Sequence, residues 1–513
     1  MYLLTPEQSK AADRFAIEKL KVPGKLLMQN AGVCAAQIAR DLLRDRGENP
    51  SVLVLCGSGN NGGDGYVAAA VLAGEGADVT VFEYEPSKKR SADAALHRGR
   101  AKKLLKTFFR LEKGPLFSGA LARADLVIDA LYGTGFRAPL PAPLAALLDE
   151  VNAAQAKKLA IDVPTGVDCA AGAADPHAFS ADVTAAMSYP MRSLLLLPGR
   201  AFAGRIEVCD LGVDYRAIEE NGRFTEQATD PALLRSVFSP RPADSNKGTY
   251  GRLLLVCGSG KMPGACLLAL AGALRVGPGL VEVCAPRSVC DLAALRHPEA
   301  LFFPLPEPED WTESVLVSLL SEAAKADAVL VGCGLGASEN VKLLVSALLS
   351  TEGAPAVLDA DALNALAACG YPAGRGDRPL VLTPHPLEFS RLTGLSREEI
   401  AADRVAAAKR YATENGVTLL LKGADTVAAS PRGETLLNPT GNPGLAKGGS
   451  GDVLAGMIAG LLAQGKPCFA SAAAAAYLHG AAGDLLARAR SEYSYLPSDL
   501  PDAAGRVLAR LLR

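Results

Sequence analysis

Two segments of the chain share one order of features, and this order limits what the chain can fold into. The first reads SVLVLCGSG from Ser51, and the second reads RLLLVCGSG from Arg252. In each, a short apolar run breaks into a glycine turn, and an Ala- and Leu-rich stretch typical of a helix follows. Units of this kind build parallel sheets. We therefore expect two α/β domains, each of which begins its own sheet.

Further apolar runs extend both sheets. In the first half they cover 125–131, 159–163 and 206–211, and in the second half 328–332, 356–361, 379–383 and 418–422, with a hairpin at 426–430 and 434–437. A helix is predicted from Asp452, because apolar residues recur after it at helical spacing. The stretch 214–246 is polar, with one short apolar run near Leu233. We place the domain junction there and predict domains at 1–224 and 225–513.

Composition excludes several classes of partner. The net charge of −2 and the aromatic content of 5% disfavour nucleic-acid binding. The start of the chain lacks a signal-peptide pattern, and Thr5 with Gln8 predicts a capping box instead. Apolar windows such as 472–478 are too short for a membrane span. The 11 cysteines show no metal-site spacing. We expect them to be buried thiols of a cytoplasmic protein, without a disulfide framework.

The glycine turn of the first domain carries unusual polar groups. Gly57, Gly59 and Gly62 form a GxGxxG pattern with Glu83 about 20 residues on. By itself this pattern fits a dinucleotide site or only a tight turn. Asn60, Asn61 and Asp64 add oxygen atoms that a plain dinucleotide loop does not need.

Three further oxygen-bearing side chains follow strand ends of this domain. Asp129 and Asp162 end two predicted strands, and Thr165 lies on the loop after the second. Ligands of open α/β sheets bind at this edge, so these groups could meet Asn61 around a cation. The alternative is that each Asp only caps the helix that follows. Asn61, Asp129 and Thr165 together carry one full negative charge, which suits a large monovalent ion better than Mg²⁺ or Zn²⁺.

The segments NNGGDG (60–65), DALYGTG (129–135) and DVPTG (162–166) resemble the NAD(P)H-hydrate epimerase family over residues 1–220. The resemblance implies a Rossmann-like domain that interconverts the R and S forms of hydrated NAD(P)H. It implies K⁺ ligands at Asn61, Asp129 and Thr165. The substrate positions that it implies are Asn60, Asn61, Gly62, Gly63, Asp64, Gly133, Thr134, Gly135, Phe136, Arg137, Ala138, Pro139 and Asp162. Gln29 and Thr165 stand where the family usually has Glu and Ser.

The strongest motif of the second domain is NPGLAKGGSGDVL at 442–454. A glycine run before a helix offers backbone amides to phosphate, and Asp452 beside it can act as a general base. The alternative for Asp452 is an ordinary helix cap. No Walker A sequence is present, and the motif resembles the ribokinase-like superfamily. His385, between two prolines after a strand, is a further candidate, although a lone histidine is more often structural.

The segments KGTYG (247–251), GCGLG (332–336) and LKGADT (421–426) complete a resemblance to the NAD(P)H-hydrate dehydratase family over 230–513. It implies substrate positions at Ala265, Gly334, His385 and Asp452. It implies nucleotide positions at Lys422, Gly423, Ala424, Asp425, Thr426 and Gly451. Cys333 and Leu387 stand where the family usually has Pro and Gly.

The two resemblances together predict a bifunctional enzyme that repairs hydrated NAD(P)H. Because hydroxide leaves poorly, a kinase-like domain with Mg²⁺ can convert the ring hydroxyl to phosphate, which leaves easily. We expect ADP as the donor, giving AMP and phosphate, although the residues do not decide between ADP and ATP. The expected partners are these small molecules and a second copy of the chain in a homo-oligomer. The alternative is a ribokinase-like small-molecule kinase fused to a nucleotide-sensing module.

Overall fold

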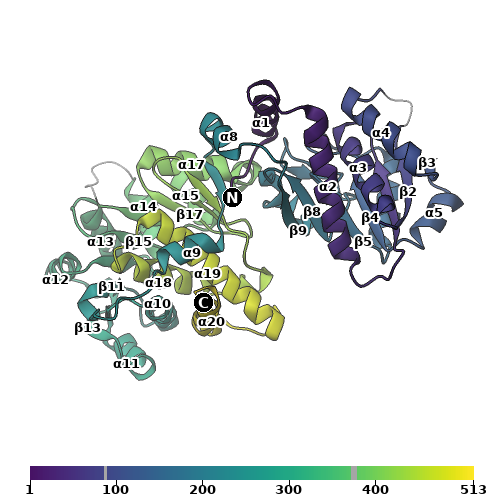
Figure 1. The fold of residues 1–513 in the computed structure, drawn as a ribbon. Coiled ribbons are helices and arrows are strands. Elements are labelled where there is room, and N and C mark those ends of the chain that lie inside the picture. Colours follow the sequence, from purple (N-terminus) through teal and green to yellow (C-terminus); the bar gives the residue numbers. More distant parts are fainter. Residues whose placement is uncertain (86–88, 371–377, 513) are drawn as a thin grey trace. The chain divides into compact units, whose positions relative to one another are not determined.

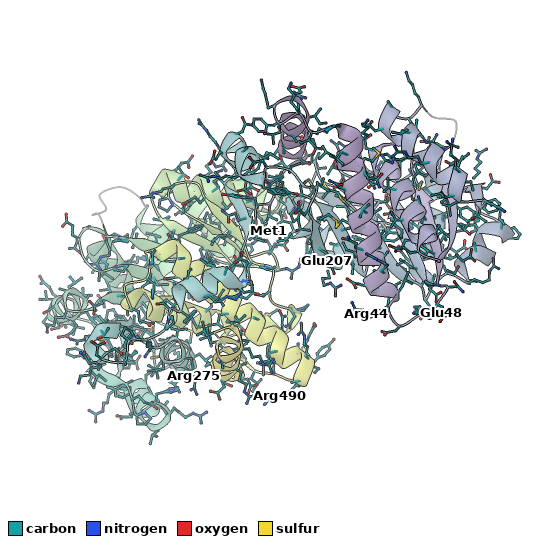
Figure 2. All side chains as sticks on the ribbon, viewed as in Figure 1. Met1, Arg44, Glu48, Glu207, Arg275 and Arg490 are labelled. Carbon is teal, nitrogen blue, oxygen red and sulfur yellow. A yellow bond between two sulfur atoms is a disulfide. The ribbon has the colours of Figure 1, made fainter. Side chains whose placement is uncertain are left out.

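The computed structural model describes residues 1–85, 89–370 and 378–512. The chain forms two compact units, Met1–Glu226 and Gln227–Arg513, which are described separately (Figure 1). This boundary lies two residues after the junction that the sequence predicts between residues 224 and 225. Charged side chains such as Arg44, Glu48 and Arg490 lie at the surface (Figure 2). None of the helices in the described residues is long and apolar enough to cross a membrane.

The first unit is built on a parallel sheet of seven strands in the order β3-β2-β1-β4-β5-β8-β9. The order reverses between β1 and β4, as in the Rossmann-like fold that the sequence predicts. The strands are β1 (Ser51–Cys56), β2 (Asp78–Glu83), β3 (Phe108–Arg110), β4 (Leu126–Ala130), β5 (Lys157–Ile161), β8 (Val183–Met187) and β9 (Arg205–Cys209), with a separate small pair β6 (Val167–Asp168) and β7 (Ala173–Ala174).

Helices cover both faces of this sheet. Along β1, Val52 and Val54 pack on the side of α2 and α3, while Leu53 and Leu55 pack on the side of α5 and α6. This alternation is the period of a strand buried on both faces. The helices are α1 (Pro6–Glu18), α2 (Gly24–Leu43), α3 (Asn60–Gly74), α4 (Ala92–Leu104), α5 (Pro115–Leu121), α6 (Ala142–Ala153), α7 (Arg200–Ala203) and α8 (Tyr215–Gly222).

The start of the chain and two cysteines join distant parts of the first unit. The predicted capping box between Thr5 and Gln8 is confirmed at the start of α1. Cys34 of α2 and Cys209 of β9 form a disulfide, so the expectation that all cysteines are free thiols was wrong for this pair. The two residues are 175 positions apart in sequence, and only the packing of α2 against the sheet brings them together.

The second unit contains a sheet of ten strands in the order β10-β19-β18-β17-β16-β15-β14-β11-β12-β13. The predicted hairpin is confirmed, because β17, β18 and β19 pair antiparallel. The strands are β10 (Glu226–Ala228), β11 (Arg252–Val256), β12 (Leu280–Pro286), β13 (Leu301–Leu305), β14 (Ala328–Val331), β15 (Ala356–Leu358), β16 (Leu380–Leu382), β17 (Thr418–Leu421), β18 (Val427–Ala429) and β19 (Thr435–Leu437).

Long apolar helices complete the second unit. α10, α18 and α19 pack on one face of the sheet, where they form a single core with alternate strand residues. The helices are α9 (Pro231–Val237), α10 (Pro263–Val276), α11 (Arg287–Arg296), α12 (Glu313–Ala324), α13 (Glu339–Leu349), α14 (Asp361–Cys369), α15 (Pro386–Thr393), α16 (Arg397–Ala402), α17 (Arg404–Asn415), α18 (Ser450–Ala463), α19 (Cys468–Ala489) and α20 (Leu500–Leu511).

The polar stretch 214–246 is more ordered than its sequence suggests. It contains α8, β10 and α9, and both helices begin with an aspartate whose side chain accepts a backbone N–H. Each helix has at most eight residues, which is too short for a periodic apolar pattern to be read. Thr229, just after β10, donates its N–H to Leu437 O over 2.9 Å, so this segment is attached to the second sheet.

We predict that residues 225–513 fold without the first unit, since they contain a complete sheet and core. Far-UV circular dichroism and a cooperative thermal transition test this prediction. A chain that begins at residue 231 lacks β10 and leaves β19 as an open edge. Its unfolding temperature should be lower by roughly 2–8 °C, for a loss of about 1–2 kcal/mol. An insoluble 225–513 chain, or equal stability of the two chains, contradicts the prediction.

Candidate active sites

The loop between β1 and α3 is tightly packed at its glycines. A Cβ atom at Gly57 would overlap the carbonyl oxygen of Leu131, and one at Gly62 would overlap the carbonyl oxygen of Gly57. Asn60 begins α3 directly after this turn, so the free N–H groups of the helix start face the carboxyl edge of the sheet. The predicted positions Asn60 to Asp64 therefore lie at a helix start of the kind that can bind an anion.

Glu83 does not serve the loop as a ribose ligand would. At the end of β2 it is buried, and it accepts hydrogen bonds from Tyr66 Oη over 2.8 Å and from Arg98 Nη2 over 2.8 Å. These protein donors engage its carboxylate. The polar chemistry of this edge belongs to Asn61, Asp64 and the loops after β4 and β5.

Asp129 and Thr165 meet at the adjacent strand ends. Asp129 is 0% exposed, and its carboxylate accepts hydrogen bonds from Thr165 N over 2.7 Å and from Thr165 Oγ1 over 2.8 Å. Burial raises the pKa of Asp129 to about 6 despite these donors. Asn61 lies 8% exposed on the first turn of α3, and neither its Oδ1 nor its Nδ2 has a hydrogen-bond partner.

These three side chains fit a large monovalent cation. Asn61 has a buried carbonyl oxygen that lacks a donor, and Asp129 supplies a buried charge that a cation would stabilise. All the donor atoms are oxygens. No hydrogen bond joins the Asn61 side chain to Asp129 or Thr165, so hydrogen bonds link two of the three predicted ligands and the third stays a proposal.

Asp162 anchors the predicted substrate loop 133–139. It has φ +67, an uncommon conformation for a residue with a side chain, and its Oδ2 accepts the N–H of Thr134 over 2.9 Å. Asp168 holds the other end of the loop, because its Oδ2 accepts the N–H of Ala138 over 3.2 Å. Burial raises the pKa of Asp162 to about 6. This carboxyl group therefore titrates close to neutral pH.

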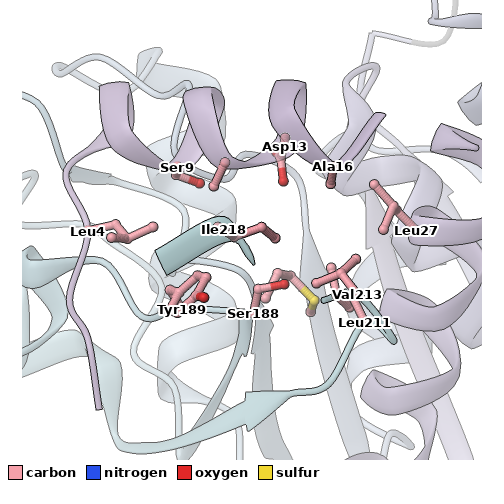
Figure 3. Close-up of a pocket in the computed structure, with 12 residues that line it drawn as sticks. Leu4, Ser9, Asp13, Ala16, Leu27, Ser188, Tyr189, Leu211, Val213 and Ile218 are labelled. Atoms are coloured by element: carbon pink, nitrogen blue, oxygen red, sulfur yellow. The ribbon is translucent and has the colours of Figure 1, made fainter. Parts of the chain in front are cut away.

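Sequence analysis missed one carboxylate at this site. Asp13 points from α1 toward a small pocket, which Ser188, Tyr189 and Leu211 line from below (Figure 3). Part of the Asp13 residue is accessible to water, but neighbouring protein atoms desolvate its carboxyl group and so raise its pKa. Burial, Asp162 and Asp13 together raise the pKa of Asp64 well above its usual range. These three carboxyl groups therefore influence one another.

In the second unit, a buried ion pair lies beside the glycine turn. Lys422 Nζ donates to Asp359 Oδ1 over 2.7 Å, and Thr383 Oγ1 donates to the same oxygen over 2.8 Å. A Cβ at Gly451 would lie 3.2 Å from Lys422 Nζ. Lys422, Asp359 and the first turn of α18 therefore form one site, and Asp359 is a residue that sequence analysis missed.

Asp452 lies on that first turn of α18. Burial and the neighbouring charge of Asp359 raise its pKa to about 6, although Lys422 acts in the opposite direction. A carboxyl group with this pKa is largely ionised at neutral pH and can still accept a proton. The amide groups at the helix start lie next to it.

Local contacts hold several of the other predicted nucleotide and substrate positions. Gly334 packs so closely on Ala265 that a Cβ would lie 2.7 Å from the Ala265 side chain. The turn Lys422–Thr426 is closed by Thr426 Oγ1, which donates to Gly423 O over 2.8 Å. Arg404, which sequence analysis missed, supports the turn by donating to Lys422 O over 3.0 Å.

His385 has a structural task at the start of α15. Its Nδ1 accepts the N–H groups of Leu387 and Glu388 over 3.1 and 3.2 Å. The ring proton must then lie on Nε2, which faces Glu388 Oε1 at 3.3 Å. Burial and the nearby Lys422 lower the pKa of His385, so the ring is neutral. It can still donate from Nε2, but it is not a free base.

The second unit has a mainly parallel sheet with an antiparallel edge, and a carboxylate lies beside the glycine turn at the start of one of its helices. These features define it as a ribokinase-like enzyme domain. A ribokinase-like superfamily protein of Enterococcus faecalis has a similar fold. It shares 29% identity and a TM-score of 0.50, covering 56% of this chain and 96% of its own. The model of the NAD(P)H-hydrate dehydratase family matches residues 253–506, and that of the YjeF-related protein N-terminus matches residues 24–193.

Curated relatives contain both halves. The chain is 38% identical to the bifunctional NAD(P)H-hydrate repair enzyme Nnr of Moorella thermoacetica, over 100% of this chain and 97% of that protein. It is 36% identical to the enzyme of the same name from Thermofilum pendens, over 96% of this chain and 94% of that protein. The chain therefore belongs to the family of bifunctional NAD(P)H-hydrate repair enzymes.

The position of Asp452 depends on how closely α18 approaches α10. A Cβ at Gly456 would overlap the carbonyl oxygen of Ala269, and one at Gly272 would overlap that of Val453. We predict that Gly456→Ala lowers the stability of the second unit by roughly 1–3 kcal/mol, because the added methyl group forces the helices apart.

Gly505→Ala is the matched control, since Gly505 lies within α20 with no atom near its missing Cβ. This change should be neutral or stabilise by up to about 1 kcal/mol. Urea unfolding of residues 225–513 measures both. Equal midpoints for the two variants would show that the α10–α18 contact is not tight.

Proposed function

We propose that the chain repairs hydrated NAD(P)H in two steps. The first unit interconverts the R and S epimers, and the second dehydrates the S epimer with a nucleotide as phosphoryl donor. The meeting of Asp452, Asp359 and Lys422 at the start of α18 carries the proposal, because it joins a base, a cation and an anion-binding helix start. The likeness to bifunctional repair enzymes over the full chain supports the same activity.

In the first unit, we assign Asp162 as the acid–base group of epimerisation. Protonated Asp162 gives its proton to the ring hydroxyl, the C–O bond breaks, and the lone pair of the ring nitrogen forms a C=N bond. Water then adds from the other face and returns the proton. A pKa of about 6 leaves both forms of Asp162 available near neutral pH. Asn61, Asp129 and Thr165 would hold K⁺, which would keep the three loops in register.

In the second unit, Asp452 takes the proton of the substrate hydroxyl. The oxygen attacks the terminal phosphorus of the donor, and the shortened nucleotide leaves. The C–O bond to the ring then breaks with its electron pair on the departing phosphate, and water takes a proton from the adjacent ring carbon, which restores the double bond. Mg²⁺ bound to the nucleotide phosphates would neutralise the charge that develops there. The N–H groups of the α18 start and Lys422 would bind the same phosphates.

We further propose ADP as the donor, with AMP and phosphate as products, and a homo-oligomeric assembly in the cytoplasm. Nine of the 11 cysteines are free thiols, which suits a reducing compartment. Light scattering of the full chain tests the assembly. The rival activity, a small-molecule kinase fused to a sensing module, would leave a stable phosphorylated product, which mass spectrometry would detect.

Asp452→Asn should slow dehydration by roughly 100-fold or more and leave nucleotide binding largely unchanged, because the amide cannot accept the hydroxyl proton. The assay follows the return of NADH absorbance from the S epimer. Glu313→Gln, an exposed acid in the first turn of α12, is the matched control and should keep full activity. The wild-type rate should rise with pH through about 6, where Asp452 ionises, and then level off. Near-normal turnover of the Asn variant would refute the assignment.

Epimerisation should require K⁺ and should slow when Na⁺ or choline replaces it. Asp129→Ala should have the same effect on R-epimer consumption, while dehydration of purified S epimer by the second unit is unchanged. Asp125→Ala is the control, because Asp125 precedes the other end of β4 and holds Ser51 N instead. A rate indifferent to the ion and to Asp129→Ala would mean that Asp129 and Thr165 only fix their loops.

A further inference from the structure

A thiol and two carboxylates meet at the catalytic edge of the second sheet. Cys333 follows β14, Asp359 follows β15, and Asp452 lies on the first turn of α18. One possible ligand atom from each lies within 4.8 Å of the others. Cys333 is 0% exposed and Asp359 is 2% exposed, so two of the three side chains are withdrawn from water. Among the residues that the structure describes, no other group of three or more His, Cys, Asp and Glu side chains brings its possible ligand atoms this close together.

The spacing is close to that of a tetrahedral zinc site. Bond lengths of about 2.3 Å to sulfur and 2.0 Å to oxygen place these two ligands about 3.5 Å apart in a tetrahedron. The Cys333 Sγ and Asp359 Oδ2 atoms are 3.8 Å apart. A small movement of Asp452 would bring its carboxylate oxygen to the same separation. Lys422 occupies the other oxygen of Asp359, Oδ1, so the ion pair and a metal do not compete for one atom.

The ligand set favours zinc. Cys257 follows the neighbouring strand, where Gly258 N donates to Cys333 O over 2.8 Å, but its sulfur is not among the ligand atoms that lie within 4.8 Å of one another. Three protein ligands leave the fourth tetrahedral position to water. One sulfur with two carboxylate oxygens favours Zn²⁺ over Mg²⁺ or K⁺, which prefer oxygen ligands alone.

The cluster also has the charge that a divalent cation needs. Two carboxylates and one thiolate would supply up to three negative charges to a bound dication. A thiol must lose its proton to bind a metal, so binding should strengthen as pH rises.

We propose that Cys333, Asp359 and Asp452 form an inhibitory site for Zn²⁺ or a similar thiophilic dication. Occupation ties the Asp452 carboxylate to the metal, so it can no longer accept the substrate proton. Inhibition follows from the proposed role of Asp452, whereas metal binding itself does not depend on that role. Because Cys333 stands where the family usually has Pro, we expect this sensitivity to be a property of this chain.

Co²⁺ titration of the metal-free full chain tests the binding. Thiolate bound to tetrahedral Co²⁺ gives a charge-transfer band in the near ultraviolet and intense visible bands, and Zn²⁺ should abolish both. We expect one site in the wild-type chain and in Cys369→Ser, which removes the exposed thiol most open to adventitious metal. Cys333→Ser and Cys333→Ala should lose the bands. Circular dichroism verifies that each variant is folded. If only one of the two Cys333 variants folds, that variant alone is sufficient for the test.

Zn²⁺ inhibition of dehydration is the second readout. The concentration of Zn²⁺ that halves the wild-type rate should rise by at least roughly tenfold in Cys333→Ser, which lacks a direct ligand. Bands that persist without Cys333, or that disappear in Cys369→Ser, overturn the site. If an active enzyme gives the bands but Zn²⁺ does not inhibit dehydration, the inhibitory role of the metal site is overturned. A chain without dehydratase activity that still gives the bands would count against the proposed function and not against the metal site.

Discussion

The second active site depends on the close contact between α10 and α18. No side chain separates the two helices at Gly272 and Gly456, so backbone meets backbone there. This approach fixes the start of α18 relative to the sheet, and with it the distance from Asp452 to Asp359 and Lys422. Interiors packed at this density do not deform gradually, so the positions of the catalytic groups are set by the core rather than by the loop.

Both units place buried carboxyl groups close together at the carboxyl edge of their sheet. Burial raises the pKa values of Asp129, Asp162 and Asp452 to about 6. Hydrogen bonds from Thr165 and Thr134 oppose this rise for the first two, and Lys422 opposes it for the third. The same physical balance therefore acts on the proposed cation ligand Asp129 and on the two groups proposed for proton transfer, Asp162 and Asp452.

Much of this arrangement could be predicted from sequence, because strand ends and glycine turns are local signals. Asp129, Asp162 and Asp452 were found from their positions after apolar runs or a glycine run. Asp359 was not, because the apolar run was extended to Asp361 while β15 ends at Leu358.

Other features depend on packing between distant segments, which a single sequence does not encode locally. Asp13 reaches the first site from α1, a helix whose position is decided by tertiary contacts. The Cys34–Cys209 pair is set by the seating of α2 on the sheet. The value of Cys333 as a ligand also appears only when β14, β15 and α18 are brought together.

The strand β10 has a consequence for how the chain is made. It begins at the last residue of the first unit, yet its neighbour in the sheet is β19, far along the second unit. On the ribosome, Glu226–Ala228 emerge long before Thr435–Leu437 exist to receive them. The first unit can therefore complete its fold while the segment behind it is still unpaired, and the second sheet closes its edge only late in translation.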